Sequence, residues 1–234
     1  MTASSARPRR AAPATVASPW TSPARRAEQR ELKRQAVLQT AAQLFNERGF
    51  HATSLDDIAE RLHVTKPTLY YYVKSKDDIL LECVRTALGL MKEGIDAVRQ
   101  SGGRALDQLV ACMRIYVDIV MQDFGMCVIR IGEDPLPAPL RKELRRLKAG
   151  IDHEFRRLIA AGVEEGTLAP CDPKMAAFMV AGGLSWVGRW YRPGGDLDPQ
   201  QIADEAVALL LGGVLAPAQR RAATRQRRAR AAGA

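Results

Sequence analysis

The sequence predicts an all-α protein, and three observations lead to this prediction. Apolar residues recur three and four positions apart along most of the chain between its two ends. Residues that cap helices precede these apolar segments, and Pro or Gly residues separate them. The alternation of Val, Ile and Thr that is typical of strands does not occur. A chain of 234 residues can bury a substantial core in one large or two small helical domains.

The first helices are expected in the N-terminal third of the chain. One helical face carries four apolar residues, which are Val37, Ala41, Leu44 and Phe45. Arg48-Gly49 then supplies a basic last turn and a glycine that can end the helix. Ser54-x-x-Asp57 is a capping box that begins a second helix, and Ser75-x-x-Asp78 repeats the pattern ahead of a fourth. Between these two boxes lies room for one more short helix.

The rest of the chain is expected to form further helices, approximately over residues 77–100, 104–122, 124–131, 140–165, 173–191 and 199–215. Ser101-Gly102-Gly103 separates the first two of them. Prolines at 135, 137 and 139 precede the charged segment 140–165. Asp172-Pro173 and Asp198-Pro199 each place a capping acid before a first-turn proline. These two dipeptides therefore predict where the last two helices begin.

Charge and composition indicate a globular protein with an anionic partner. The chain is 47% hydrophobic and 26% charged, and its formal net charge is +9. This balance favours nucleic acid or a phosphorylated ligand. Much of the excess charge lies at the two ends, where residues 1–27 predict a disordered basic arm and residues 217–234 a basic tail. The arm either follows DNA phosphates or only increases solubility; the same two alternatives apply to the tail, for which a role in solubility is favoured over a contact with DNA.

The sequence lacks the motifs that are typical of several other classes of protein. The four cysteines, at 83, 112, 127 and 171, form no C-x-x-C pair, which argues against a zinc cluster or a disulfide framework. No apolar run approaches the roughly 20 residues of a membrane span. Nucleotide-binding, hydrolase and zinc-protease motifs do not occur. We therefore expect a soluble, cytoplasmic protein that is not an enzyme, with no catalytic residue, metal site, cofactor or membrane partner.

Residues 54–73 are the segment of the sequence that most directly indicates a function. Leu55, Ile58, Ala59 and Leu62 form the apolar face of a first short helix. His63-Val64-Thr65 is long enough only for a tight turn, in which Val64 is expected to fill the space between two helices and Thr65 to cap the second. Pro67 suits the first turn of that helix, and Leu69 and Val73 face inward. This arrangement predicts a helix-turn-helix.

The second of these helices leaves a surface rich in hydrogen-bond donors, made of Lys66, Thr68, Tyr70, Tyr71 and Tyr72, with Lys74 and Lys76 just beyond. Such a surface suits the major groove of DNA, because hydroxyl and ammonium groups can bond to phosphate oxygens and base edges. The alternative is a short helix pair of no special function, with some tyrosines half-buried in the core.

Three motifs resemble the N-terminal domain of the tetracycline-repressor (TetR) family: Ala41-Ala42-x-Leu44-Phe45-x-x-x-Gly49-Phe50, Thr53-Ser54-x-x-Asp57-Ile58-Ala59 and Val64-Thr65-Lys66-x-Thr68-Leu69-Tyr70-Tyr71-Tyr72-Val73-x-x-Lys76. The resemblance implies a three-helix DNA-binding domain over residues 28–76 and a ligand-binding and dimerisation domain over 77–216. It also implies that double-stranded operator DNA is recognised by Lys66, Thr68, Tyr70 and Tyr71, with phosphate contacts from Ser54, Tyr72 and Lys76. Thr65 is also expected among the DNA-binding residues. Pro67 stands where the family often has glycine or serine, so the base preference stays open.

Apolar stripes with small residues run along 173–191 and 199–215, and include Met175, Phe178, Met179, Gly182, Trp186, Ile202, Ala206, Leu209, Leu210 and Gly213. In one subunit they could simply be core. The TetR resemblance implies that these last two helices join with those of a second copy in a homodimer. A two-fold dimer also matches the half-site geometry that helix-turn-helix proteins need.

A second, shorter motif is Trp186-Val-Gly-Arg189-Trp190-Tyr191-Arg192-Pro193-Gly-Gly-x-Leu197-x-Pro199, followed by Ile202-Ala203. It resembles the C-terminal motif of regulators of fatty-acid and sterol breakdown, several of which respond to acyl-CoA thioesters. The implied protein is a repressor released from its operator by a small hydrophobic effector such as an acyl-CoA thioester. The expected effector residues are Met113, Tyr116, Phe124, Arg130, Phe178 and Arg189. Plain core packing of these residues, an effector of another chemistry, and a non-specific architectural DNA binder remain the alternatives.

Overall fold

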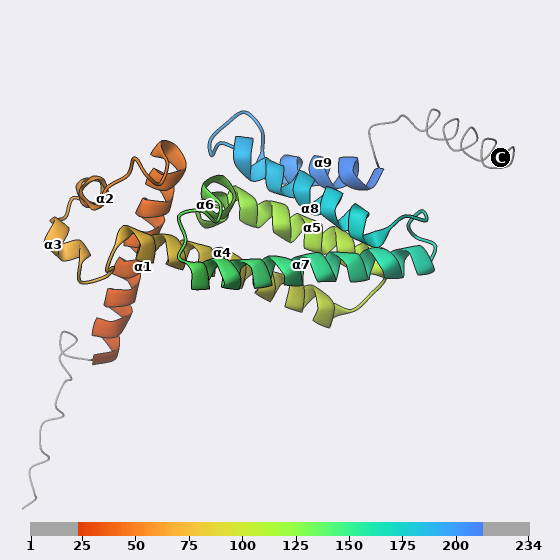
Figure 1. Cartoon of the computed structure of the whole chain (residues 1–234), viewed down its shortest axis with the longest axis horizontal. Helices are drawn as coiled ribbons and strands as arrows, with labels where there is room; N and C mark the ends of the chain where they lie inside the picture. Colours follow the sequence, from red (N-terminus) through yellow and green to blue (C-terminus); the bar gives the residue numbers. More distant parts are fainter. Residues whose placement is uncertain (1–22, 213–234) are drawn as a thin grey trace, which may run out of the picture.

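The computed structural model describes residues 23–212, which contain nine helices and no strand (Figure 1). The prediction of an all-α fold is confirmed. The helices are α1 (Pro23–Arg48), α2 (Leu55–Arg61), α3 (Lys66–Leu69), α4 (Lys76–Ser101), α5 (Ala105–Met121), α6 (Asp123–Ile131), α7 (Ala138–Glu164), α8 (Pro173–Trp190) and α9 (Pro199–Gly212).

Helices α1, α2 and α3 form one end of the molecule, here called the head, and α5–α9 form the core at the other end (Figure 1). The long helix α4 runs from the head into the core, where it packs against α5, α6 and α7. The apolar face expected on the first helix is buried, because Ala41, Leu44 and Phe45 are each at most 1% exposed. The head is therefore a small packed unit attached to the core mainly through α1 and α4.

Helix α1 begins at Pro23, so the last five residues assigned to a disordered arm are helical instead. Proline suits a first helical turn, and the alanine, arginine and glutamine residues that follow favour a helix. Helix α7 likewise begins two residues earlier than expected, at Ala138. The remainder of the predicted arm, the basic tail and the end of the segment 199–215, including Gly213, lie outside the described residues.

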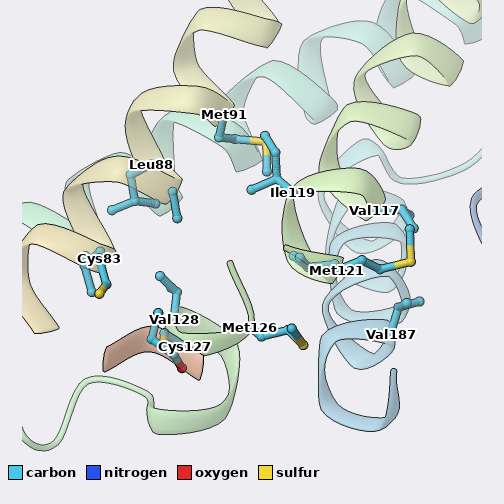
Figure 2. Close-up of a cluster of buried hydrophobic side chains, with 14 of the residues drawn as sticks. Cys83, Leu88, Met91, Val117, Ile119, Met121, Met126, Cys127, Val128 and Val187 are labelled. Carbon is cyan, nitrogen blue, oxygen red and sulfur yellow. The ribbon is translucent and has the colours of Figure 1, made fainter. Parts of the chain in front are cut away.

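Helix α6 is the element through which the head meets the core. It packs against α1, α4, α5 and α8. Met126, Cys127 and Val128 are buried among these helices, and Figure 2 shows them between α4 residues such as Cys83 and the α8 residue Val187. The Cys127 thiol also lies 3.5 Å from the backbone oxygen of Ala42 in α1. A shift of α6 must therefore displace residues of both the head and the core.

A buried ion-pair cluster joins α4 to α7. The Glu154 carboxylate, whose side chain is only 3% exposed, accepts hydrogen bonds from Arg99 at 2.8 Å and from Arg157 at 2.7 Å. These hydrogen bonds, led by that of Arg157 and opposed by burial, lower the pKa of Glu154 to about 2. Both arginines are about half exposed, so water can solvate them if the carboxylate is lost.

Glu154→Gln is expected to lower the free energy of unfolding at pH 7 by at most about 3 kcal/mol, at 1.36 kcal/mol per pKa unit. Because the folded pKa lies below that of the unfolded chain, the carboxylate stabilises the fold above about pH 4.5. That contribution disappears as the pH falls toward 2. Urea unfolding of both proteins between pH 7 and pH 3 checks this. A difference that stays constant over that range would contradict the assignment.

Candidate nucleic-acid interface and effector cavities

The predicted capping box at the start of α2 is confirmed. The Ser54 hydroxyl accepts from the Asp57 backbone N–H at 3.1 Å, and the Asp57 carboxylate accepts from the Ser54 N–H at 2.7 Å. Hydrogen bonds from Ser54 also lower the pKa of Asp57. Arg48 adds an ion pair to the same carboxylate at 3.3 Å, which ties the end of α1 to α2. The cap thus fixes the angle between these helices.

The turn between α2 and α3 differs from the prediction in two respects. Val64 is 38% exposed and does not fill the space between the helices, where Ile58, Ala59 and Leu69 provide the buried contacts instead. Thr65 is the N-cap residue of α3, but its hydroxyl bonds to the Thr68 hydroxyl at 2.9 Å rather than to a backbone N–H. One physical reason is Pro67, which lacks the N–H that an N-cap side chain could bind.

Helix α3 lies at the outer edge of the head (Figure 1), and the donor-rich surface formed by α3 and the turn at Tyr70 and Tyr71 after it is here called the α3 surface. Lys66, Tyr70 and Tyr71 are exposed, with Tyr71 at 74%, while Leu69 beneath them is fully buried. Thr68 is half-buried on the same helix. Tyr72 departs from the expected pattern, because its ring is half-buried and packs against the hydrophobic core.

Two lysines of the predicted interface have partners within the protein. The Lys66 ammonium lies 2.8 Å from the Asp56 carboxylate of α2, and this hydrogen bond raises the pKa of Lys66. Lys76 donates to the backbone oxygens of Phe50 and Thr53, at 2.8 and 2.9 Å, and lies over the Phe50 ring. Lys76 therefore ties α4 to the loop before α2. Its expected phosphate contact stays a prediction that requires these bonds to be displaced.

Sequence reasoning missed the contacts that hold α1 against α3 and α4. Arg30 donates to the backbone oxygen of Tyr71 at 3.4 Å. Arg34 forms an ion pair with Glu82 at 2.6 Å, which raises the pKa of Arg34. The partners are 41 and 48 positions apart in the chain, so no local sequence pattern predicts either contact. Arg30 and Arg34 thus hold α1 against the turn after α3 and against α4.

A pocket of about 460 Å³ is bounded by α5, α6, α7 and α8 and is partly open to the surface, since Phe178 and Trp186 in its wall are exposed; it is here called the core cavity. It contains three of the six expected effector residues, Tyr116, Phe178 and Arg189. The Tyr116 hydroxyl lies 2.7 Å from the Ser185 hydroxyl in its wall, and burial raises the pKa of Tyr116. Apolar side chains line most of this cavity, Lys148 and Arg189 add positive charge, and Asp152 adds a negative charge.

A second cavity of about 920 Å³ lies between α1, α6 and the end of α8, here called the junction cavity. It contains Arg130 and, again, Arg189. Arg130 already donates to the backbone oxygens of Gly188, Asn46 and Tyr191 at 2.9, 3.3 and 2.5 Å, so its contact with an effector stays a prediction.

The remaining two expected effector residues lie elsewhere. Phe124 lines a smaller cavity of about 390 Å³ beside Thr86 and Leu90. Met113 is fully buried in the hydrophobic core and lines none of the cavities described here among residues 23–212, so its contact with an effector stays a prediction. The six residues have side chains that suit one ligand, but the structure places them around α6 in different cavities or in the core.

Two negative findings concern residues 23–212. No helix there combines the length and the apolar character needed to cross a bilayer. No group of three or more His, Cys, Asp or Glu side chains in that range is placed to hold a metal ion.

Known proteins match both parts of this architecture. Residues 37–83 match the family model of bacterial regulatory proteins of the tetR family, and residues 102–214 match that of the tetracyclin repressor-like C-terminal domain. The HTH-type transcriptional repressor KstR2 of Mycobacterium tuberculosis is 27% identical over 78% of this chain and 92% of its own. The HTH-type transcriptional regulator RutR of Escherichia coli K12 is 33% identical over 63% of this chain and 70% of its own.

A solved structure of AibR in complex with isovaleryl coenzyme A and operator DNA is also similar to this chain. Its TM-score is 0.67 at 26% sequence identity, and the match covers 76% of this chain and 97% of that one.

Proposed function

Because this chain belongs to the TetR family of DNA-binding transcription regulators, we propose that it is a repressor that leaves its operator when a small hydrophobic effector binds. The observation that carries the DNA-binding half of this proposal is the exposed donor-rich surface of α3 at the outer edge of the head. Lys66, Thr68, Tyr70 and Tyr71 contact base edges, and the capped start of α2 at Ser54 lies against phosphates. Thr65, Tyr72 and Lys76 flank this contact.

The protein acts as a homodimer through α8 and α9. Their surface carries large exposed apolar side chains, Met175, Met179, Trp186 and Leu209, and the exposed Leu197 lies in the loop between the two helices. A groove of about 640 Å³ between the two helices is lined mainly by apolar atoms, with Gly183 and Leu210 in its wall. A contiguous apolar surface of this kind typically marks a protein–protein interface. Two heads related by two-fold symmetry then reach the two half-sites of an operator.

The effector is an acyl-CoA thioester whose acyl group occupies the core cavity. Ile129, Ile151 and Phe178 supply an apolar lining, while Lys148 and Arg189 place cations at the same cavity. This combination suits a molecule with an apolar end and an anionic end. The isovaleryl coenzyme A bound by AibR supports this choice of effector class. Release from DNA requires that the effector bind the released conformation more tightly than the DNA-bound one.

The test measures binding of the full chain to DNA from its own promoter while CoA thioesters of different acyl chains are added. At least one thioester is expected to release the DNA, and free CoA or the free fatty acid at the same concentration to do so less well. Ala181→Leu, which fills the core cavity, should weaken the response, whereas Ala149→Leu on the exposed face of α7 should not. If no thioester either releases DNA or raises the melting temperature, the effector proposal is wrong.

A further inference from the structure

The junction cavity has chemistry that the core cavity lacks. Its walls come from Gln43 and Asn46 of α1, from α6, and from residues 189–193 at the end of α8. Polar atoms make up much of its lining, and it is twice as large as the core cavity, at about 920 against 460 Å³. A ligand there would touch the head and the core at once.

Three arginines, Arg130, Arg189 and Arg192, line this cavity, against two carboxylates. Arg189 and Arg192 form no ion pair within the described part of the chain. The Glu47 carboxylate is already paired with Arg61 at 2.8 Å, and that of Asp123 accepts from Gln43 at 3.1 Å. The cavity therefore favours an anion, and guanidinium groups are well suited to phosphates.

A third guanidinium forms the floor of the cavity. Arg130 is held there by backbone oxygens rather than by a carboxylate. Burial, and also the nearby charge of Arg192, lower the pKa of Arg130. An anion in the cavity would reduce this repulsion. The indole of Trp190, which is 43% exposed, adds a flat surface on which a planar ring can stack.

The two cavities meet at one side chain, because Arg189 lines both. The two cavities lie along opposite sides of α6. Val128 and Ile129 line the core cavity, whereas Met126 and Arg130 line the junction cavity. A CoA thioester has the same division into an acyl end and a phosphorylated nucleotide end. One elongated ligand can thus place its acyl end in the core cavity and its phosphorylated end in the junction cavity.

We propose that the junction cavity is the subsite for the phosphorylated nucleotide half of the effector, with Arg192 and Arg189 binding its phosphates and Trp190 stacking on its base. This inference rests on the proposed function, in which the effector is a CoA thioester. It assigns different tasks to the two halves of the ligand. The acyl half gives chemical selectivity, and the nucleotide half reaches α1 and so connects binding to the position of the head.

The coupling follows from the contacts that already cross the junction. Arg130 of α6 bonds to the Asn46 backbone, and the Asn46 side-chain amide donates to the Asp123 backbone oxygen at 2.9 Å. A nucleotide seated between α1 and residues 189–193 can fit well with only one placement of the head relative to the core. Differential affinity of this kind is what an effector needs in order to change operator binding.

The experiment titrates the full-length protein calorimetrically with three probes: an acyl-CoA that releases DNA, the matching acyl-pantetheine, which lacks the nucleotide, and adenosine 3′,5′-bisphosphate. Arg192→Gln is expected to weaken the bisphosphate and the acyl-CoA by about 10-fold or more, and to leave the acyl-pantetheine unchanged. Ala181→Leu is expected to weaken the binding of the acyl-pantetheine and to leave the affinity for the bisphosphate unchanged.

Two variants serve as controls. Arg104→Gln removes an exposed arginine at the start of α5, far from the junction cavity, and Lys66→Ala removes a cation of the α3 surface that could itself attract phosphate. Neither should change the affinity for adenosine 3′,5′-bisphosphate.

The inference is overturned if the bisphosphate does not bind the unmodified protein, or if Arg192→Gln leaves its affinity unchanged. An acyl-CoA that releases DNA from both the unmodified and the Arg192→Gln protein at equal concentration would refute this subsite and leave the proposed function standing. If no CoA thioester releases DNA, the proposed function fails instead, and the bisphosphate titration still decides whether the junction cavity binds a nucleotide.

Discussion

Replacing Lys66 and Tyr71 together by alanine is expected to reduce operator affinity by about 100-fold or more, because two side chains that contact DNA are lost at once. Both belong to the exposed surface of α3, and Tyr71 is 74% exposed. Neither contributes to the buried face of the head, which Leu69 and Val73 provide. The fold and the dimer should therefore persist. Fluorescence anisotropy with operator DNA at one fixed salt concentration measures the loss.

A matched control separates a specific contact from a general effect of charge. Lys92→Ala removes a lysine on α4 that is more exposed than Lys66, at 68% against 43%, and whose ammonium pairs with Asp96 rather than lying near α3. This variant should bind the operator with nearly unchanged affinity. Sedimentation should give the same mass for all three proteins. Operator binding that survives in the double variant would refute the assignment of α3 as the recognition helix.

Gly125→Ala is expected to lower the free energy of unfolding by about 3 kcal/mol, at the upper end of the range for overpacked sites. A Cβ atom at this position would lie 1.8 Å from the backbone oxygen of Ile119 and 2.9 Å from the Cα of Val120. Because these are backbone atoms, no side chain can rotate away to make room. The corner between α5 and α6 must open, which shifts the helix that carries Asp123 and Arg130. Urea unfolding at a fixed protein concentration measures the change.

The control for this variant is Gly150→Ala. Gly150 lies in the middle of α7, is exposed, and would place its new Cβ with no atom within 4 Å. Alanine there is expected to stabilise the protein by up to about 1 kcal/mol, since glycine is a poor helix former. Equal destabilisation by both substitutions would show that loss of a helical glycine, and not the close approach of α5 and α6, sets the cost.

Local rules in the sequence determined the helices and the exposed α3 surface. The Ser54–Asp57 capping box, the first-turn proline at 67 and the helical spacing of Ala41, Leu44 and Phe45 each act over one or two turns of chain. Their outcome depends little on distant residues, and the structure agrees with all three. The predicted recognition residues on α3 follow from the same short-range logic, because burying Leu69 and Val73 leaves the polar side chains outside.

The partners of the charged groups and the effector cavities were decided only by the tertiary structure. Lys76 reaches carbonyl oxygens 23 and 26 positions earlier, and Arg34 pairs with Glu82 across 48 positions. The expected effector residues share suitable chemistry, yet Met113 is core and Arg130 holds backbone oxygens. The physical reason is the packing of α6 among α1, α4, α5 and α8, which depends on close contacts such as that at Gly125. Such contacts depend on the shapes of distant surfaces, whereas helix formation depends on neighbours along the chain.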